Sequence, residues 1–185
     1  KLMAKGISET GTFYFYNKKK QSIPIVFIHG VGLTYEIWQP QLDYFNEYST
    51  LSYDILGHGK SKLEKEIITF DDFSNQLITL IDELKIDKIH LVGFSIGSLI
   101  ARDFASKHNE RLQSLILLGS IFKRTDEQQK IVNERYNQAK KQMKLSKQAL
   151  KRWFTNEYLK KNPNTYEKIS TILSANNMEN FLKVY

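Results

Sequence analysis

The chain has 185 residues, of which 41% are hydrophobic and 12% aromatic, and it contains no cysteine. This composition favours one domain with a real core and excludes disulfides, cysteine-ligated zinc and a thiol nucleophile. The net charge of +7 is uneven: residues 1–122 carry 13 Lys and Arg against 14 Asp and Glu, whereas residues 123–185 carry 14 against 6. The basic residues are scattered at helical spacing, which indicates a solvated helical surface rather than nucleic-acid binding.

Neither a membrane span nor a secretory leader is expected. The apolar runs fall short of the roughly 20 residues that a membrane helix needs. The first residues lack a long apolar stretch of the kind found in signal peptides. The sequence therefore favours a cytoplasmic location.

The first two thirds of the chain alternate between short apolar runs and amphipathic segments. We predict strands at 12–16, 23–28, 50–55, 88–93 and 112–118, and helices at 37–48, 70–84 and 98–107. Continuous apolar strands separated by helices are typical of an α/β fold with a doubly wound, mostly parallel sheet. Residues 123–185 contain no strand-like run and predict several short helices that cover the sheet.

The segment Gly93-Phe94-Ser95-Ile96-Gly97 follows a predicted buried strand and opens a predicted helix. A Gly-x-Ser-x-Gly match in this position indicates a nucleophile elbow, a sharp turn that exposes a serine at the carboxyl end of the strand. The start of the following helix favours negative charge that develops there. The alternative is a tight turn with an incidental serine.

Two further glycine-containing loops also follow predicted strands. In His29-Gly30-Val31-Gly32, we interpret His29 as structural and expect the Val31 backbone N–H to form an oxyanion hole with that of Ile96. The loop 54–61 lacks the spacing of a phosphate-binding loop. We therefore expect Asp54 to cap its own loop and His58 to face solvent or to pack near the mouth of the site.

Taken together, these three motifs resemble those of the α/β-hydrolase superfamily, in the branch that carries a lid. That branch includes carboxylesterases, enol-lactone hydrolases, C–C bond hydrolases and cofactor-free haloperoxidases. The resemblance covers about residues 12–122 and implies that Ser95 is the nucleophile, supported by His29, Gly30, Gly93 and Gly97. It also implies that residues 1–122 are the first part of the core and that residues 123–185 are the helical cap.

This resemblance implies that the substrate is a small ester, lactone or thioester. It also implies that the reaction needs no cofactor and no metal. Four aromatic side chains are candidates for the pocket wall: Phe94, Phe122, Trp153 and Phe154. The alternative for each is ordinary packing in the apolar core. A ligand-binding or degenerate homologue on the same fold is the main alternative to an enzyme.

The catalytic base is where the sequence departs from the pattern. A serine needs a positioned base, and in this fold an acid and then a histidine follow the nucleophile. His108 alone follows Ser95, at the far end of a predicted helix and about 20 Å away. We therefore expect a fragment that ends inside the cap, has an unpaired apolar sheet edge and is inactive by itself.

Overall fold

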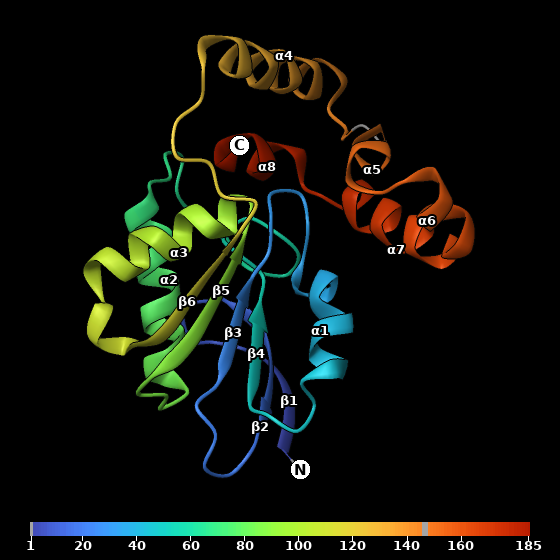
Figure 1. Cartoon of the computed structure of the whole chain (residues 1–185). Helices are drawn as coiled ribbons and strands as arrows, with labels where there is room; N and C mark the ends of the chain where they lie inside the picture. The colour runs from blue at the N-terminus through green and yellow to red at the C-terminus, as the bar shows by residue number, and fades with distance from the viewer. Residues whose placement is uncertain (1, 146–147) are drawn as a thin grey trace.

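The computed structural model describes residues 2–145 and 148–185. Six strands form one sheet in the order β1-β2-β4-β3-β5-β6 (Figure 1). Their bounds are β1 (Leu2–Ile7), β2 (Phe13–Lys18), β3 (Ile25–Ile28), β4 (Thr50–Tyr53), β5 (Ile89–Phe94) and β6 (Leu112–Leu118). The pairs β3/β4, β3/β5 and β5/β6 are parallel, whereas β1/β2 and β2/β4 are antiparallel. The predicted α/β fold with a mostly parallel sheet is thus confirmed.

Helices cover both faces of the sheet (Figure 1). The helices α2 (Phe70–Glu83) and α3 (Ile96–Lys107) lie on one face, and the 3-10 helix η1 (Tyr35–Trp38) and α1 (Gln39–Tyr44) lie on the other. Side chains of β3 alternate between two clusters: Val26 and Ile28 belong to the α2–α3 side, while Phe27 packs with Trp38 and Leu42. This two-sided burial is why the central strands read as continuous apolar runs.

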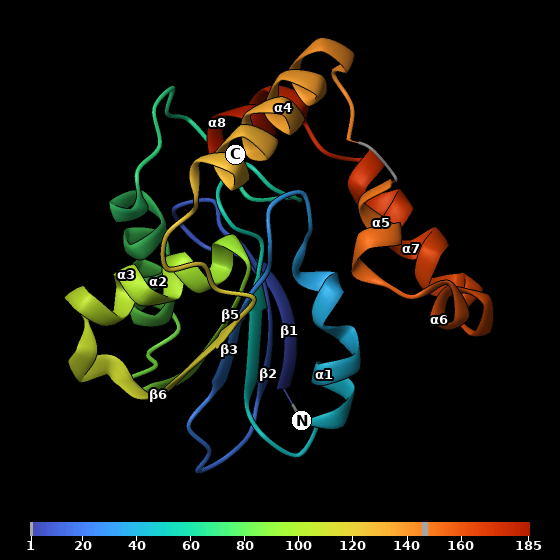
Figure 2. The same cartoon turned by 45° about the horizontal axis from the view of Figure 1, so that its top comes forward.

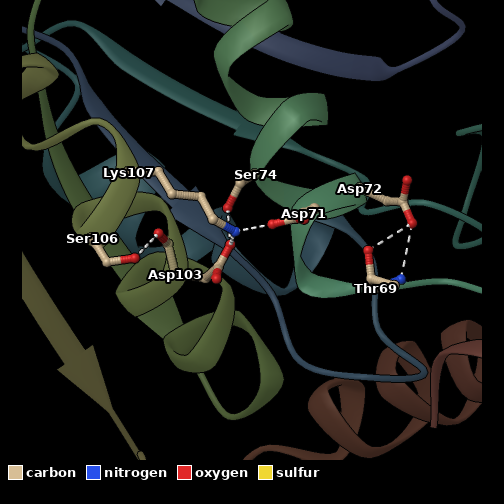
Figure 3. Close-up of polar contacts among 7 residues, drawn as sticks. All are labelled: Thr69, Asp71, Asp72, Ser74, Asp103, Ser106 and Lys107. Carbon is tan, nitrogen blue, oxygen red and sulfur yellow. Dashed lines mark hydrogen bonds and ion pairs between the residues drawn. The ribbon is translucent and has the colours of Figure 1, made fainter.

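A polar cluster that is partly open to solvent joins α2 to α3 (Figure 3). Lys107 of α3 pairs with Asp71 of α2 and, at 2.6 Å, with Asp103 of its own helix. The Ser74 hydroxyl of α2 donates to the same Asp103 carboxylate at 2.6 Å. These contacts connect the outer parts of the two helices, whose apolar faces pack in the larger core.

Several boundaries differ from the sequence-based prediction. The strand β1 was not predicted, because its apolar pattern is weak. It forms a hairpin with β2, and this pairing is not visible in the local sequence. The predicted helix at 37–48 is shorter, since Pro40 lies at the start of α1, where its missing N–H costs nothing. The start of α2 is as predicted: Thr69 and Asp72 form a capping box (Figure 3).

The last part of the chain is helical, as expected. Its helices are α4 (Asp126–Gln142), α5 (Gln148–Trp153), α6 (Asn156–Lys161), α7 (Pro163–Ser174) and α8 (Met178–Val184). In both views they gather beyond one end of the sheet (Figures 1 and 2). Leu33 contacts α5 and α7, because it packs with Leu150, Ile169 and Leu173 in a separate apolar cluster. Within the described residues, no helix has the length and apolar character needed to cross a membrane.

The strand β6 forms one edge of the sheet and carries exposed apolar side chains. Leu115, Ile116, Leu117 and Leu118 are between 37% and 48% exposed. No strand pairs with its outer edge in the part of the chain that the structure describes. The expected unpaired apolar edge is therefore present in this structure.

Candidate active site

Ser95 stands at the sharp turn between β5 and α3. Its backbone has φ 56° and ψ −121°, a conformation that costs free energy for any residue with a Cβ. The two flanking glycines permit the turn. A Cβ at Gly93 would lie closer than 3.0 Å to the Gly97 carbonyl, and one at Gly97 would do so with the Ile28 carbonyl. The elbow thus depends on both glycines to bring β3, β5 and α3 together.

The main chain of Ser95 is fixed while its side chain is not. Its N–H donates to the Leu118 carbonyl at 3.0 Å, and its own carbonyl accepts from the Ser98 hydroxyl at 2.5 Å. The Ser95 Oγ forms no hydrogen bond with the described residues, and the residue is half-buried. The hydroxyl is therefore held in place by the backbone and remains available to a ligand.

Two backbone N–H groups near this serine have no acceptor among the described residues. Ile96 is the first residue of α3, so its N–H has no intrahelical partner. The N–H of Val31 likewise lacks an acceptor within the described ranges. The loop of Val31 lies against the serine, because a Cβ at Gly30 would be 3.3 Å from the Ser95 Cβ. These are the two N–H groups that the sequence predicts for an oxyanion hole, and both are available to a ligand.

Two buried histidines connect the loops that follow β3 and β4. The His29 Nε2 accepts the N–H of Ile55 at 3.1 Å, and the His58 Nε2 accepts the N–H of Gly32 at 2.8 Å. Their Nδ1 atoms lie 2.8 Å and 3.2 Å from the carbonyls of Gly30 and Leu56, respectively. Each loop therefore contributes one histidine that binds the backbone of the other.

This arrangement requires neutral imidazoles. Burial and, to a smaller extent, the nearby His58 lower the pKa of His29 to about 3. Burial also lowers the pKa of His58 to about 4. The structural interpretation of His29 agrees with these contacts. Of the two places expected for His58, the solvent-facing one is wrong, because only 1% of the residue is exposed and its ring binds the Gly32 N–H of the Val31 loop.

Asp54 caps its own loop, as predicted. Its two carboxylate oxygens accept the N–H groups of Tyr35 at 2.8 Å and Lys60 at 3.0 Å. Burial raises the pKa of Asp54 to about 6, although these two hydrogen bonds act in the opposite direction. The carboxyl group thus serves the loop backbone rather than the serine.

Sequence reasoning missed two supporting amides. Gln76 of α2 accepts the N–H of Leu56 at 3.1 Å and donates to the Asp54 carbonyl at 3.0 Å. Asn176 donates to the Gly32 carbonyl at 2.7 Å and so connects the last helices to the Val31 loop. The position of Gln76 on the apolar face of α2 was a usable signal, whereas nothing local marks Asn176.

A cavity of about 560 Å³ brings the three predicted catalytic groups together with the last helices. Ser95, Val31 and Ile96 all line it, and so does Trp153. The other lining residues come mainly from the segments around α3, α4, α5 and α8: Phe70, Leu99, Gly119, Ile121, Arg124, Val132, Arg135, Ala139, Lys144, Leu145, Ala149, Arg152, Leu173, Phe181, Val184 and Tyr185.

Three of the four aromatic candidates for the pocket wall lie elsewhere. Phe122 is 91% exposed, because the chain leaves the sheet at this point. Phe154 stacks on Tyr158 and packs in the apolar cluster of the last helices. Phe94 packs between that cluster and the core on the α1 side of the sheet. These three residues therefore do not line this cavity, and their place in a substrate pocket stays a prediction.

The cavity contains no general base among the described residues. No histidine, aspartate or glutamate lines it. His108 ends α3 at the opposite end from Ser95, with its ring 4.9 Å from that of Phe104. Within residues 2–145 and 148–185, no group of three His, Asp or Glu side chains is arranged to hold a metal ion.

Comparison with known proteins gives the family. The alpha/beta hydrolase fold family matches residues 23–152, which include all three motifs. The chain belongs to this family. Two curated relatives come from Acinetobacter baylyi. The chain is 29% identical over 171 residues to an (E)-2-((N-methylformamido)methylene)succinate hydrolase. It is 26% identical over 158 residues to 3-oxoadipate enol-lactonase 2. These matches cover 92% and 85% of the chain.

The relatives are longer than this chain, which covers 64% and 59% of the two Acinetobacter proteins. Among solved structures, the enol-lactonase from Burkholderia xenovorans matches 98% of the chain with a TM-score of 0.83 at 23% identity. The match covers 71% of that structure. A thermophilic esterase from Thermogutta terrifontis matches with a TM-score of 0.77 at 20% identity, over 99% of this chain and 70% of its own. At such identities these structures support the fold alone.

Proposed function

We propose that this protein is a serine hydrolase that cleaves a small ester, lactone or thioester through an acyl-serine intermediate. The observation that carries the proposal is the convergence of the unpaired Ser95 hydroxyl with the free N–H groups of Val31 and Ile96 on one cavity. The relatives named as a succinate hydrolase and as enol-lactonases support hydrolysis as the class of reaction.

The proposed reaction follows from this arrangement. The Ser95 Oγ attacks the carbonyl carbon while its proton passes to a base, and the Val31 and Ile96 N–H groups stabilise the negative oxygen of the tetrahedral intermediate. The bond from the carbonyl carbon to the leaving oxygen or sulfur then breaks, and the leaving group takes the proton. Water next attacks the acyl-serine, which releases the acid and restores the hydroxyl.

The base and the acid that positions it are proposed to lie outside residues 1–185. No His, Asp or Glu side chain lines the cavity in the described ranges, and a serine hydroxyl reacts slowly without a base. On this proposal, residues 1–122 form part of the hydrolase core and residues 123–185 form a cap over the cavity. The chain of 185 residues alone should show little turnover.

The coding DNA beyond the Tyr185 codon provides the first test. We expect an open frame that encodes further strands and delivers an acidic residue and then a histidine. A stop codon directly after Tyr185 would favour the alternative function, a non-catalytic ligand-binding protein. The lack of a base at the cavity is the observation that favours this alternative.

A direct test uses the protein from the complete reading frame. A fluorophosphonate should label Ser95, and the enzyme should hydrolyse p-nitrophenyl acetate. The Ser95→Ala variant should lose both signals, while Ser106→Ala, a matched control on the exposed end of the same helix, should keep them. Turnover that survives in Ser95→Ala would refute the assignment of the nucleophile.

A further inference from the structure

The charged side chains that line the cavity are all basic in the part of the chain that the structure describes. Arg124, Arg135, Lys144 and Arg152 line the cavity, and no acidic side chain does so among the described residues. All four cations belong to residues 123–185, whereas Ser95 and the N–H groups of Val31 and Ile96 belong to the sheet loops and to the start of α3. The cavity therefore has a reactive wall on the sheet side and a cationic wall on the helical side.

Helix α4 presents a cation to the cavity and directs its acidic residues elsewhere. Val132, Arg135 and Ala139 line the cavity at steps of three and four residues, so they share one face of the helix. Asp126 and Glu134 are not among the lining residues. The positive charge that reaches the cavity is thus not balanced by the acidic groups of the same helix.

These four cations also lack partners elsewhere. In residues 2–145 and 148–185, none of them forms an ion pair with a carboxylate. Other basic side chains of the chain do so: Lys65, Lys107, Arg111, Lys161 and Lys183. The four charges at the cavity are therefore not neutralised by a carboxylate of the described residues.

We propose that the substrate is an anionic acyl compound, an ester or lactone that carries a free carboxylate away from the bond that is cleaved. This inference rests on the proposed function and names its substrate class. Guanidinium groups bind carboxylates through paired, charge-assisted hydrogen bonds. A cavity of about 560 Å³ holds a small acyl chain between the serine and the cationic wall.

Binding tests this proposal without requiring turnover. Monomethyl adipate and dimethyl adipate differ by one carboxylate, so each is titrated into the 185-residue chain by calorimetry. We expect the monoanion to bind at least about tenfold more tightly than the neutral diester, an advantage that added salt should reduce. The Arg135→Gln variant should lose about tenfold in affinity for the monoanion and little for the diester.

A matched control separates the cavity from the overall charge. Lys130→Gln removes one positive charge from the same helix at a position that does not line the cavity, and it should bind as the unmodified chain does. Arg135→Lys should restore part of the preference, and thermal melts should show that all variants fold. Equal binding of both ligands, equal losses in the two glutamine variants, or no binding of either ligand at millimolar concentration would overturn the proposal.

The two proposals fail in different ways. An anion preference without fluorophosphonate labelling of Ser95 would leave the cationic wall assigned and remove the nucleophile. Labelling of Ser95 without an anion preference would retain the hydrolase and remove the substrate class.

Discussion

Removal of the His58 side chain should weaken the loop that carries Val31, the proposed oxyanion donor. In the His58→Ala variant, the Gly32 N–H loses its acceptor at 2.8 Å and the Leu56 carbonyl loses its donor at 3.2 Å. The His58 side chain shields both groups from solvent, since the residue itself is only 1% exposed. Each buried polar group left without a partner costs about 1–3 kcal/mol, and water that enters the space recovers part of this. We therefore expect the free energy of unfolding to fall by about 2–4 kcal/mol.

Urea denaturation of the 185-residue chain at pH 7.5 measures this loss as a lower midpoint with an unchanged slope. Amide exchange at Gly32 should also accelerate, because its N–H is no longer bonded. His108→Ala is the matched control, since this ring lies at the end of α3 and contacts Phe104; it should cost under about 1 kcal/mol. Equal losses in the two variants would refute the role given to His58.

Three further predictions concern pH, backbone strain and the sheet edge. Acidification from about pH 6.5 to about pH 4 should destabilise the chain, because His29 and His58 bind protons in this range when the chain is unfolded but only near pH 3 and pH 4 when it is folded. The raised pKa of Asp54 acts in the opposite direction, but it is one group against two. Urea midpoints that rise on acidification would contradict this prediction. The Ser95→Gly variant should be more stable than Ser95→Ala by about 1 kcal/mol in the same assay, because glycine tolerates φ 56°. A more stable alanine variant would show that the turn is unstrained. Ile116→Lys should reduce self-association measured by light scattering, because it places a charge on the exposed strand β6, whereas unchanged scattering would mean that another surface drives association.

Most of the fold was predictable because its signals are local. Buried parallel strands have continuous apolar runs, and α2 has a clear apolar face with a capping box at Thr69. The exceptions depend on partners distant in sequence. The strand β1 is stabilised by pairing with β2, which a weakly patterned segment does not reveal.

The candidate site was predictable to the extent that glycines constrain it. Gly93 and Gly97 mark the turn at Ser95, because any larger residue would collide with neighbouring backbone. The aromatic pocket residues were predicted less well. Phe122 is exposed and Phe154 packs between helices, since the direction of an aromatic side chain depends on how the helices pack.

The sequence by itself determined the family, the order of the strands and helices, and the serine at the elbow. These follow from residue spacing and from backbone sterics, which act over a few residues. The tertiary structure decided how the loops and charges are used. His29 and His58 anchor each other's loops. Four cations of a segment whose sequence indicates a solvated surface line the same cavity as Ser95. Hydrogen bonds across loops and charges around a cavity depend on segments far apart in the chain, so only the folded structure brings them together.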